Sequence, residues 1–404
     1  PKHLWWEIPV QPPYKRCRYF FELQAGAERV FYFEDGFHSP DDVKNGQLGQ
    51  CFTFPWMNSA DINVTPKWVR ETVWYQIFPE RFCNGNKEND PDWVKPWGYH
   101  TVSNLDFYGG DLDGIRQKLP YLQELGITGL YLTPVFESPS SHKYDTTDYR
   151  KIDPGFGDEE TMKLLVKEAH DRGIRVMLDG VFNHCGSNFL TWRDVMEKGP
   201  QSPYYDWFMI NRWPCREQEG STRDGRYYSF AFAERMPKLN TSEKKVRDYF
   251  LDTVRYWIET FDIDGLRLDV ANEISHLFCR ELRQMTKQLK PDFYLLGEIW
   301  HDAMPWLGGD EFDAVMNYPF AAAIREFWYR PEKTKSDLEE AIHENLVRYM
   351  RQTTEVLFNL LDSHDTDRLI HQTGGNQDLF FQQLAMLFTM PGSPCIYYGT
   401  EIAI

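Results

Sequence analysis

From Thr72 onward, short apolar runs alternate with longer stretches in which apolar residues recur at helical spacing. Four such stretches predict amphipathic helices, over residues 113–126, 158–173, 242–261 and 380–390. The apolar runs predict eight buried strands, at residues 73–79, 127–136, 174–184, 264–271, 293–300, 312–319, 355–365 and 393–401. Strands that alternate with helices form a parallel sheet covered on both faces, and eight strands can close into a barrel. The predicted fold class is therefore α/β, with an eight-stranded parallel β/α (TIM) barrel.

Two regions depart from this alternation. Residues 1–65 include two aromatic strands around a glycine-containing turn, and they predict part of an all-β, sandwich-like N-terminal domain. The barrel is assigned to residues 66–404. Within it, residues 185–239 follow the third strand, are rich in Trp, Tyr, Arg, Gly and Pro, and are too long for a βα loop, so they predict a small inserted domain. The chain ends just after the eighth strand, which we interpret as a truncation before the closing helix.

The composition narrows the class of protein. Hydrophobic residues make up 42% and charged residues 26%, as in a globular protein, while a net charge of −17 without a basic run disfavours nucleic acid and anionic membranes as partners. The seven cysteines are scattered and form no C-x-x-C pair, which favours reduced thiols over disulfides or a zinc site. No apolar run reaches the ~18 residues of a membrane span, and the first residues lack the pattern of a signal peptide. We therefore expect a cytoplasmic enzyme.

Charged residues interrupt the fourth predicted strand. Side chains alternate along a strand, so Arg267 and Asp269 share one face of residues 264–271 while Leu266, Leu268 and Val270 share the other. Both charges then point into the barrel. A buried ion pair seldom stabilises a fold more than apolar packing does, so this arrangement favours a chemical role, in which Arg267 keeps Asp269 ionised.

Further acids follow other strands. Glu298 ends the fifth strand, and Asp362 and Asp365 end the seventh. The carboxyl ends of barrel strands meet at one face, so these acids are expected to converge on one cavity, and two carboxyl groups that flank a bond suit glycoside cleavage. Each acid alone could equally cap a helix. Capping does not explain Arg267 or the nearby histidines.

The segments that carry these residues resemble the short sequence regions of the α-amylase family of glycoside hydrolases. They are DGVFNH (179–184), GLRLDVANE (265–273), GEIW (297–300) and LLDSHD (360–365), in the family's order. A further segment, MPKLN (236–240), is similar to that of the neopullulanase, cyclomaltodextrinase and maltogenic amylase group. The resemblance implies a β/α barrel with a domain inserted after the third strand, an N-terminal β domain, and a C-terminal β domain that we expect this chain to lack.

The resemblance also implies roles for residues at matching positions. Asp269 would be the nucleophile, Glu298 the acid/base and Asp365 the third acid, which stabilises the distorted sugar. The other matched residues would bind substrate: Arg267, His184, His364, Tyr144, His142, Trp300, Asn272 and Glu273. Of these, Trp300, Asn272 and Glu273 would lie on the acceptor side of the cleft.

Residues 83–91 are dense in side-chain oxygens. The twelfth position counted from Asn84 is Lys95, so the segment is not an EF-hand, and the residues alone favour a polar turn. The resemblance implies instead a structural calcium ion, because part of the group binds calcium through such a loop and the segment YGGDL. Its ligands would be Asn84, Asn86, Asn89, Asp90, Gly109 and Asp111.

The implied activity is that of a retaining α-glucan hydrolase. It would cleave α-1,4-glucosidic bonds in cyclodextrins, pullulan and maltodextrins through a covalent glycosyl-enzyme, with transglycosylation as a secondary activity and α-1,6 cleavage left open. One alternative is a transferase or oligo-α-1,6-glucosidase of the same family, and MPKLN disfavours the glucosidase. The other is an inactive barrel used for binding, which the presence of all three acids disfavours. The resemblance further implies a homodimer when the protein is full length.

Overall fold

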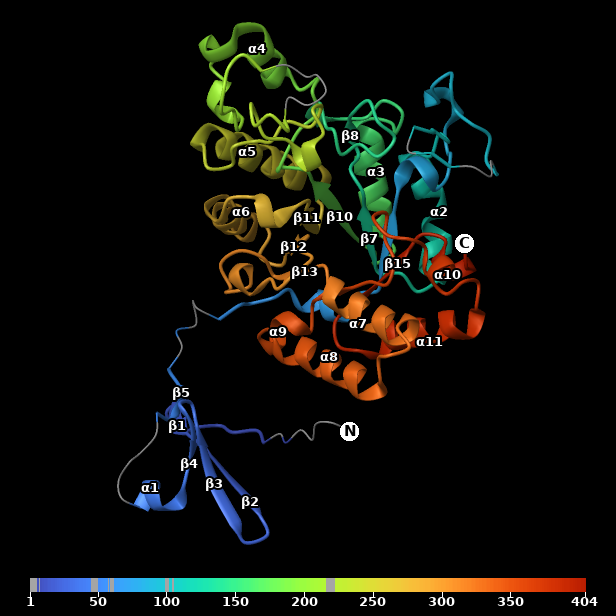
Figure 1. Cartoon of the computed structure of the whole chain (residues 1–404). Coiled ribbons are helices and arrows are strands. Elements are labelled where there is room, and N and C mark those ends of the chain that lie inside the picture. Colours follow the sequence, from blue (N-terminus) through green and yellow to red (C-terminus); the bar gives the residue numbers. More distant parts are fainter. Residues whose placement is uncertain are drawn as a thin grey trace. The chain divides into compact units, whose positions relative to one another are not determined.

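The computed structural model describes residues 6, 8–44, 50–56, 58, 62–98, 102–103, 105–215 and 222–404. The chain divides into two compact units, Pro1–Ile62 and Asn63–Ile404 (Figure 1). Parts of two expected domains lie outside the described residues: residues 216–221 of the insertion and, in the N-terminal domain, residues 1–5, 7, 45–49, 57 and 59–61.

The second unit is built around a parallel eight-stranded sheet, and each predicted apolar run contains one of its strands. In chain order the strands are β6 (Trp74–Ile77), β7 (Gly129–Leu132), β10 (Arg175–Gly180), β11 (Gly265–Leu268), β12 (Tyr294–Gly297), β13 (Ala314–Val315), β14 (Phe358–Asn359) and β15 (Ser393–Tyr397). Their order in the sheet is β13-β12-β11-β10-β7-β6-β15-β14, and a parallel bridge between Met316 and Phe358 joins the two end strands. This confirms the predicted barrel.

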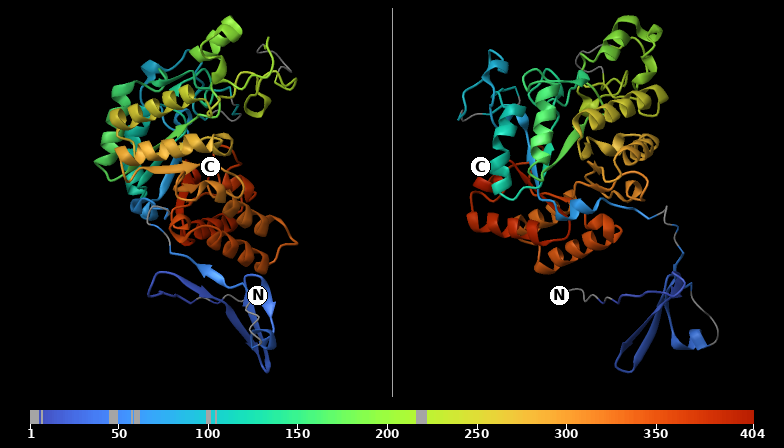
Figure 2. Two further views of the ribbon diagram at one scale, coloured as in Figure 1. Left: turned by 90° about the vertical axis from the view of Figure 1, so that its left-hand side faces the viewer. Right: turned by 180° about the vertical axis from the view of Figure 1, so that it is seen from behind.

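Helices cover the outside of the barrel (Figures 1 and 2). The four predicted helices correspond to α2 (Leu112–Glu124), α3 (Glu159–His170), α5 (Lys244–Phe261) and α11 (Gln377–Thr389). Strands such as β7 and β12 are buried at every position because the barrel interior lies on one side and the helices on the other. The remaining helices of the barrel are α6 (His276–Leu289), α7 (Tyr318–Tyr329), α8 (Lys335–Val347), α9 (Arg351–Thr354) and α10 (Leu369–Gln372).

Two insertions at the carboxyl ends of the strands build the wall of a cavity. The first contains the antiparallel pair β8 (Phe136–Glu137) and β9 (Asp148–Ile152). The second follows β10 and contains α4 (Leu190–Lys198), several 3₁₀ turns and isolated bridges. It returns to the barrel where His184 pairs with Lys238 and Phe208 pairs with Leu239.

The first unit contains short antiparallel strands. The predicted hairpin is confirmed as β2 (Phe21–Ala25) and β3 (Glu28–Phe33), and Gly26 in the connecting turn has a φ of +61°. The other elements of this unit are β1 (Cys17–Tyr19), β4 (Gly36–His38), α1 (Pro40–Lys44) and β5 (Phe52–Phe54). Strand β4 pairs with β3, and β1 pairs with β5. The exposed aromatic side chains Phe21, Phe37 and Phe54 lie on this unit.

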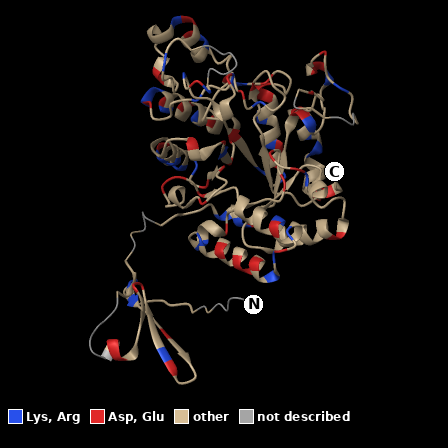
Figure 3. Cartoon of the chain, in the orientation of Figure 1, with Lys and Arg blue, Asp and Glu red and all other residues tan. Residues whose placement is uncertain are grey.

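In Figure 3, acidic and basic positions are interspersed along the outer helices of the barrel unit. Basic residues therefore accompany acidic ones along these helices despite the net charge of −17. Among the described residues, no helix combines the length and the apolar character that crossing a bilayer requires.

Candidate active site

A cavity of about 530 Å³ lies at the carboxyl ends of the barrel strands. Its wall combines residues that follow β10, β11, β12 and β14 with residues of both insertions. Most of the predicted site residues line it: His142, Tyr144, His184, Asp269, Asn272, Glu298, Trp300, His364 and Asp365. Other lining residues were not predicted, and they include Arg81, Phe230, Met236, Val270 and Tyr397.

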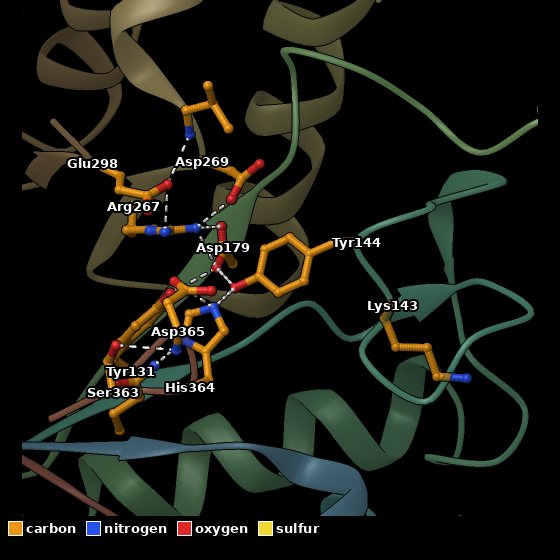
Figure 4. A network of polar contacts seen from close by, with 12 residues as sticks. Tyr131, Lys143, Tyr144, Asp179, Arg267, Asp269, Glu298, Ser363, His364 and Asp365 are labelled. Atoms are coloured by element: carbon orange, nitrogen blue, oxygen red, sulfur yellow. Dashed lines mark hydrogen bonds and ion pairs between the residues drawn. The ribbon is translucent and has the colours of Figure 1, made fainter. Parts of the chain in front are cut away.

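Arg267 lies beneath the cavity and is completely buried. Its Nη1 donates hydrogen bonds of 2.9 Å to Asp269 and to both oxygens of Asp179, and its Nη2 lies 2.7 Å from Glu298 Oε2 (Figure 4). One guanidinium therefore contacts three carboxyl groups, and the two predicted catalytic acids, Asp269 and Glu298, share it as a partner.

Asp179 is a member of this cluster that sequence reasoning missed. It lies on β10 directly opposite Arg267 in the strand register, so both side chains point into the barrel. Its Oδ2 also accepts hydrogen bonds from the hydroxyls of Tyr131 (2.7 Å) and Tyr144 (2.8 Å). The sequence did contain a signal, because Asp179 begins the DGVFNH segment, but only the tertiary structure shows that its partner is Arg267. By contrast, Lys143 points away from the cluster and pairs with Asp153 at 2.7 Å (Figure 4).

Glu298 receives a donor on each carboxyl oxygen. Oε2 accepts from the backbone N–H of Val270 at 2.9 Å, and Oε1 accepts from the indole N–H of Trp300, also at 2.9 Å. The Trp300 ring is 50% exposed and stacks on Tyr318 with ring centres 3.6 Å apart and planes 9° apart.

The alternation predicted for residues 264–271 is wrong at its end. Strand β11 stops at Leu268, and Val270 adopts the left-handed conformation with φ 45° and ψ 47°. For a β-branched residue this conformation is unfavourable by roughly 1–3 kcal/mol. The turn places Val270 in the cavity wall instead of on the face of Leu266 and Leu268, and it aims the Val270 N–H at Glu298.

The two predicted catalytic acids have pKa values that are shifted in opposite directions. Burial, reinforced by Glu298 and Asp179, raises the pKa of Asp269 well above its usual range, although Arg267 opposes this. Burial likewise acts against ionised Glu298, but Arg267 and the donors Val270 and Trp300 outweigh it and hold the pKa of Glu298 below its usual range. Arg267 favours ionised Asp269, as predicted, but its charge is shared among three carboxyl groups.

The third predicted acid and its neighbouring histidine lie together after β14. His364 Nε2 is 3.2 Å from Asp365 and 2.7 Å from the Tyr144 hydroxyl, and its Nδ1 is 2.6 Å from the Gln76 amide. Burial raises the pKa of Asp365 to about 6, and burial together with Arg267 lowers the pKa of His364 to about 4.

The other two histidines complete the polar wall. Burial and the charge of Lys238 lower the pKa of His184 to about 3, and burial lowers the pKa of His142. These imidazoles are neutral at neutral pH and suit hydrogen bonding to a neutral ligand. His184 Nε2 is buried and has no hydrogen-bond partner within the described chain.

Two acids near the cavity have structural contacts. Glu273 does not line the cavity but pairs with Lys238 at 2.9 Å, and Lys238 also donates to Asn183. Lys238 therefore ties the second insertion to the loop after β11. Asp362, at the end of the seventh predicted strand, accepts from Leu369 N–H at 2.9 Å and from the Thr400 hydroxyl at 2.8 Å, so it has the capping role that its position allowed.

The predicted calcium ligands gather only in part. Asn84 donates to Asp90 at 2.8 Å, and a Cβ added to Gly109 would meet both side chains. The side-chain oxygens of Asn84 and Asn89 are buried without partners. Asn84 and Asp90, together with other residues, border a second cavity of about 620 Å³, whereas Asn89 and Gly109 border another of about 300 Å³. In the part of the chain that the structure describes, no group of three or more His, Cys, Asp or Glu side chains could hold a metal ion.

Two other predicted ligands have backbone partners. Asp111 caps the start of α2 and accepts N–H donors from Gly85, Asn86 and Gly114. The side chain of Asn86 accepts from Glu88 N–H at the start of the 3₁₀ turn η4 (Lys87–Asn89).

A barrel that presents an arginine-linked pair of carboxyl groups in a polar cavity has the architecture of a glycoside-cleaving enzyme. Comparison with known proteins gives the same answer. Residues 76–404 match the α-amylase catalytic domain, and residues 1–58 match the α-amylase N-terminal ig-like domain.

Individual relatives match the chain over nearly its whole length. The chain is 52% identical over 402 residues to a cyclomaltodextrinase of Geobacillus thermopakistaniensis (strain MAS1), covering 99% of this chain and 67% of that protein. It is 47% identical over 402 residues to an intracellular maltogenic amylase of Bacillus subtilis (strain 168), covering 100% and 67%. A solved cyclomaltodextrinase structure superposes with a TM-score of 0.87 at 45% identity, covering 98% and 67%.

The chain belongs to the α-amylase family of glycoside hydrolases, and within that family it is of the cyclomaltodextrinase and maltogenic amylase type.

Proposed function

We propose that the chain hydrolyses α-1,4-glucosidic bonds of cyclodextrins, maltodextrins and pullulan with retention of configuration, with Asp269 as nucleophile and Glu298 as acid/base. The observation that carries this proposal is the shared contact of both carboxyl groups with Arg267 beneath one cavity. The name of the cyclomaltodextrinase relative and the MPKLN segment support cyclodextrins as the first substrate.

In the first step, Asp269 attacks the anomeric carbon while Glu298 gives its proton to the departing glycosidic oxygen. The carbon–oxygen bond to the leaving sugar breaks, and an ester bond to Asp269 forms. In the second step, Glu298 takes a proton from water, the water oxygen bonds to the anomeric carbon from the face that the leaving sugar occupied, and the ester bond to Asp269 breaks. A sugar hydroxyl in place of water gives transglycosylation.

The remaining cavity residues bind and orient the sugar in this proposal. Asp365 accepts hydrogen bonds from hydroxyls of the distorted ring, and the neutral imidazoles of His184, His364 and His142 contact other hydroxyls. Tyr144 provides an aromatic face. These groups are already tied together through Asp179, Arg267 and Gln76, so little ordering is required when the sugar binds.

Two substrates separate the two catalytic roles. α-Maltosyl fluoride needs a nucleophile but no acid, because fluoride leaves without a proton, whereas β-cyclodextrin needs both. We expect Glu298→Gln to lose turnover of β-cyclodextrin while still releasing fluoride, and Asp269→Asn to lose both reactions. The matched control is Asp362→Asn, an acid of the same region held by structural contacts. Turnover of β-cyclodextrin by Glu298→Gln at the wild-type rate would refute the assignment.

We further propose that the loop around Asn84 holds a structural calcium ion. Asn84, Asn89, Asp90 and the Gly109 carbonyl would bind it, because buried carboxamide oxygens without partners and a carboxylate are the ligands that calcium prefers. Asp111 and Asn86 would support the loop through the backbone contacts given above. The expected result is a higher unfolding temperature with Ca²⁺ than with EGTA, lost in Asp90→Ala. An equal unfolding temperature in both conditions would refute the site.

We also propose a cytoplasmic homodimer. The seven cysteines, none of which lies in a disulfide, and the name of the intracellular relative support the location. The exposed aromatic side chains of the N-terminal unit, such as Phe21, Phe37 and Phe54, support an interface between copies. Light scattering of the eluted protein should give twice the chain mass, and a monomer at micromolar concentration would refute the dimer.

A further inference from the structure

The contacts of Glu298 oppose the protonated form that the proposed first step requires. Each of its three contacts, the ion pair with Arg267 and the hydrogen bonds from Val270 N–H and the Trp300 indole, favours the ionised carboxylate. Bond cleavage instead requires a proton on Glu298. At least one of these donors must therefore weaken when substrate binds.

The three donors differ in their freedom to move. Arg267 is fully buried and is fixed by Asp179 and Asp269. The Val270 donor is a backbone group in the turn between β11 and the 3₁₀ turn η8 (Ala271–Glu273). The Trp300 indole is half exposed, and apart from its bond to Glu298 it is positioned by stacking on Tyr318. Trp300 is thus the donor that a ligand can reach and displace.

We infer that Trp300 is a positioning residue that couples occupation of its side of the cavity to the proton on Glu298. In the free protein the indole N–H holds Oε1. A sugar that binds against Trp300 and Asn272 turns the indole away, and Oε1 then takes up a proton from solvent and gives it to the leaving oxygen. This inference rests on the proposed acid/base role of Glu298.

Other groups near Glu298 remain in place when Trp300 changes. They are Arg267 and Asp269 from β11 and the turn after it, Asp179 from β10, His364 and Asp365 from the segment after β14, and Tyr318 from α7. Any shift that follows a change at Trp300 alone therefore reports the indole donor.

The test replaces the indole N–H and keeps the ring. In the full chain, Trp300 is replaced by 3-benzothienylalanine, which has sulfur in place of the N–H, and by phenylalanine as a second variant. Tyr318→Phe is the matched control, because it retains both the stacking ring and the indole donor. The measurements are the pH dependences of kcat/KM and of kcat for β-cyclodextrin.

The two profiles report different states. Because the pKa of Glu298 lies below that of Asp269, the acid limb of kcat/KM reports Glu298 in the free enzyme, and the acid limb of kcat reports it in the substrate complex. Loss of a hydrogen bond to an ionised acceptor raises the pKa of the acid, so we expect the kcat/KM limb to move up by about 0.5 to 1 pH unit. The kcat limb should stay at the wild-type position, because the indole has already left Oε1 in that state. Tyr318→Phe should leave both limbs in place.

Two other results would contradict the inference. An equal shift of both limbs would mean that the indole stays on Oε1 throughout the reaction, and no shift would mean that it does not act on the proton. If Glu298→Gln still loses β-cyclodextrin turnover but releases fluoride, the proposed function survives either result. If Glu298→Gln retains β-cyclodextrin turnover, the proposed function fails and the inference fails with it.

Discussion

Buried carboxylates have opposite surroundings at the two ends of the barrel: they share one basic partner at one end and have several each at the other. At the carboxyl end, one guanidinium contacts three carboxyl groups. At the amino end, Asp264 alone contacts three cationic side chains, His170 at 2.6 Å, Arg175 at 2.8 Å and Lys290 at 3.0 Å. Asp313 at the same end contacts Arg283 at 2.9 Å and Lys287 at 2.8 Å.

The pKa directions follow this difference. Burial opposes ionised Asp264, but the bond from His170, the charge of Lys290 and the N–H of Val176 outweigh it, so the pKa of Asp264 is lowered. Burial raises the pKa values of Asp269 and Asp365 at the other end, where cations are scarce. At the amino end each of the two carboxylates has several basic partners, which stabilises the barrel. At the carboxyl end three carboxyl groups share one arginine, and this unbalanced charge is available to a substrate.

The strongest test of this comparison is Asp269→Asn. We expect hydrolysis of β-cyclodextrin to fall by on the order of 10⁴-fold, because the attacking carboxylate is removed. The midpoint of urea unfolding should not fall, since the change lowers the excess of negative charge around Arg267. A fall in the midpoint as large as that of Asp264→Asn would contradict the comparison.

The next effect is on stability. Asp264→Asn should lower the free energy of unfolding by about 3 kcal/mol, near the lower limit for a broken buried pair because its cationic partners reach solvent. The pKa of Asp264 is lowered on folding, so this difference should be complete at pH 7 and shrink as the pH falls below about 4.

Urea unfolding at pH 7 and at a pH below about 4 measures the effect of Asp264→Asn on stability. The turnover of β-cyclodextrin per folded molecule should be unchanged. Asp310→Asn, which breaks a surface pair with Arg280, is the control and should cost less than about 1 kcal/mol. Equal losses for the two variants would mean that the amino-end cluster adds no stability.

A smaller effect is expected at Lys238, whose charge acts on His184. Lys238→Met should cost about 1 kcal/mol, because it removes the contacts with Glu273 and Asn183 that hold the second insertion. It should also raise the pKa of His184, since Lys238 lowers it. Imidazole NMR titration checks the pKa, with Lys244→Met on an exposed helix pair as the control.

The smallest effect is expected from Asp365→Asn on stability. The pKa of Asp365 is raised to about 6, so the folded wild type loses stability as the pH rises through 6, and the variant does not. Because this side chain is 38% exposed, solvent screening limits the gain at pH 7.5 to less than about 1 kcal/mol. Thermal unfolding at pH 5 and pH 7.5 measures it, and a variant that is less stable than wild type at pH 7.5 would refute the sign.

The sequence by itself determined the barrel and most residues of the cavity. Apolar runs spaced between amphipathic stretches indicate strands whose carboxyl ends meet, so Asp269, Glu298 and Asp365 could be placed at one face before any contact was known. Side chains alternate between the two faces along each strand, and that period of two specifies which face a side chain occupies.

The tertiary structure alone decided which charges share a partner. The register that sets Asp179 opposite Arg267 and the bond from Val270 N–H to Glu298 join residues far apart in the chain. The left-handed turn at Val270, the indole bond of Trp300 to Glu298 and the contact of Asp362 with Leu369 are local, but they leave no mark in the hydrophobic pattern. A pattern along one strand carries no information about the neighbouring strand's register or about where a loop turns. For that reason the sequence indicated the acids, and only the folded barrel decided that they compete for a single arginine.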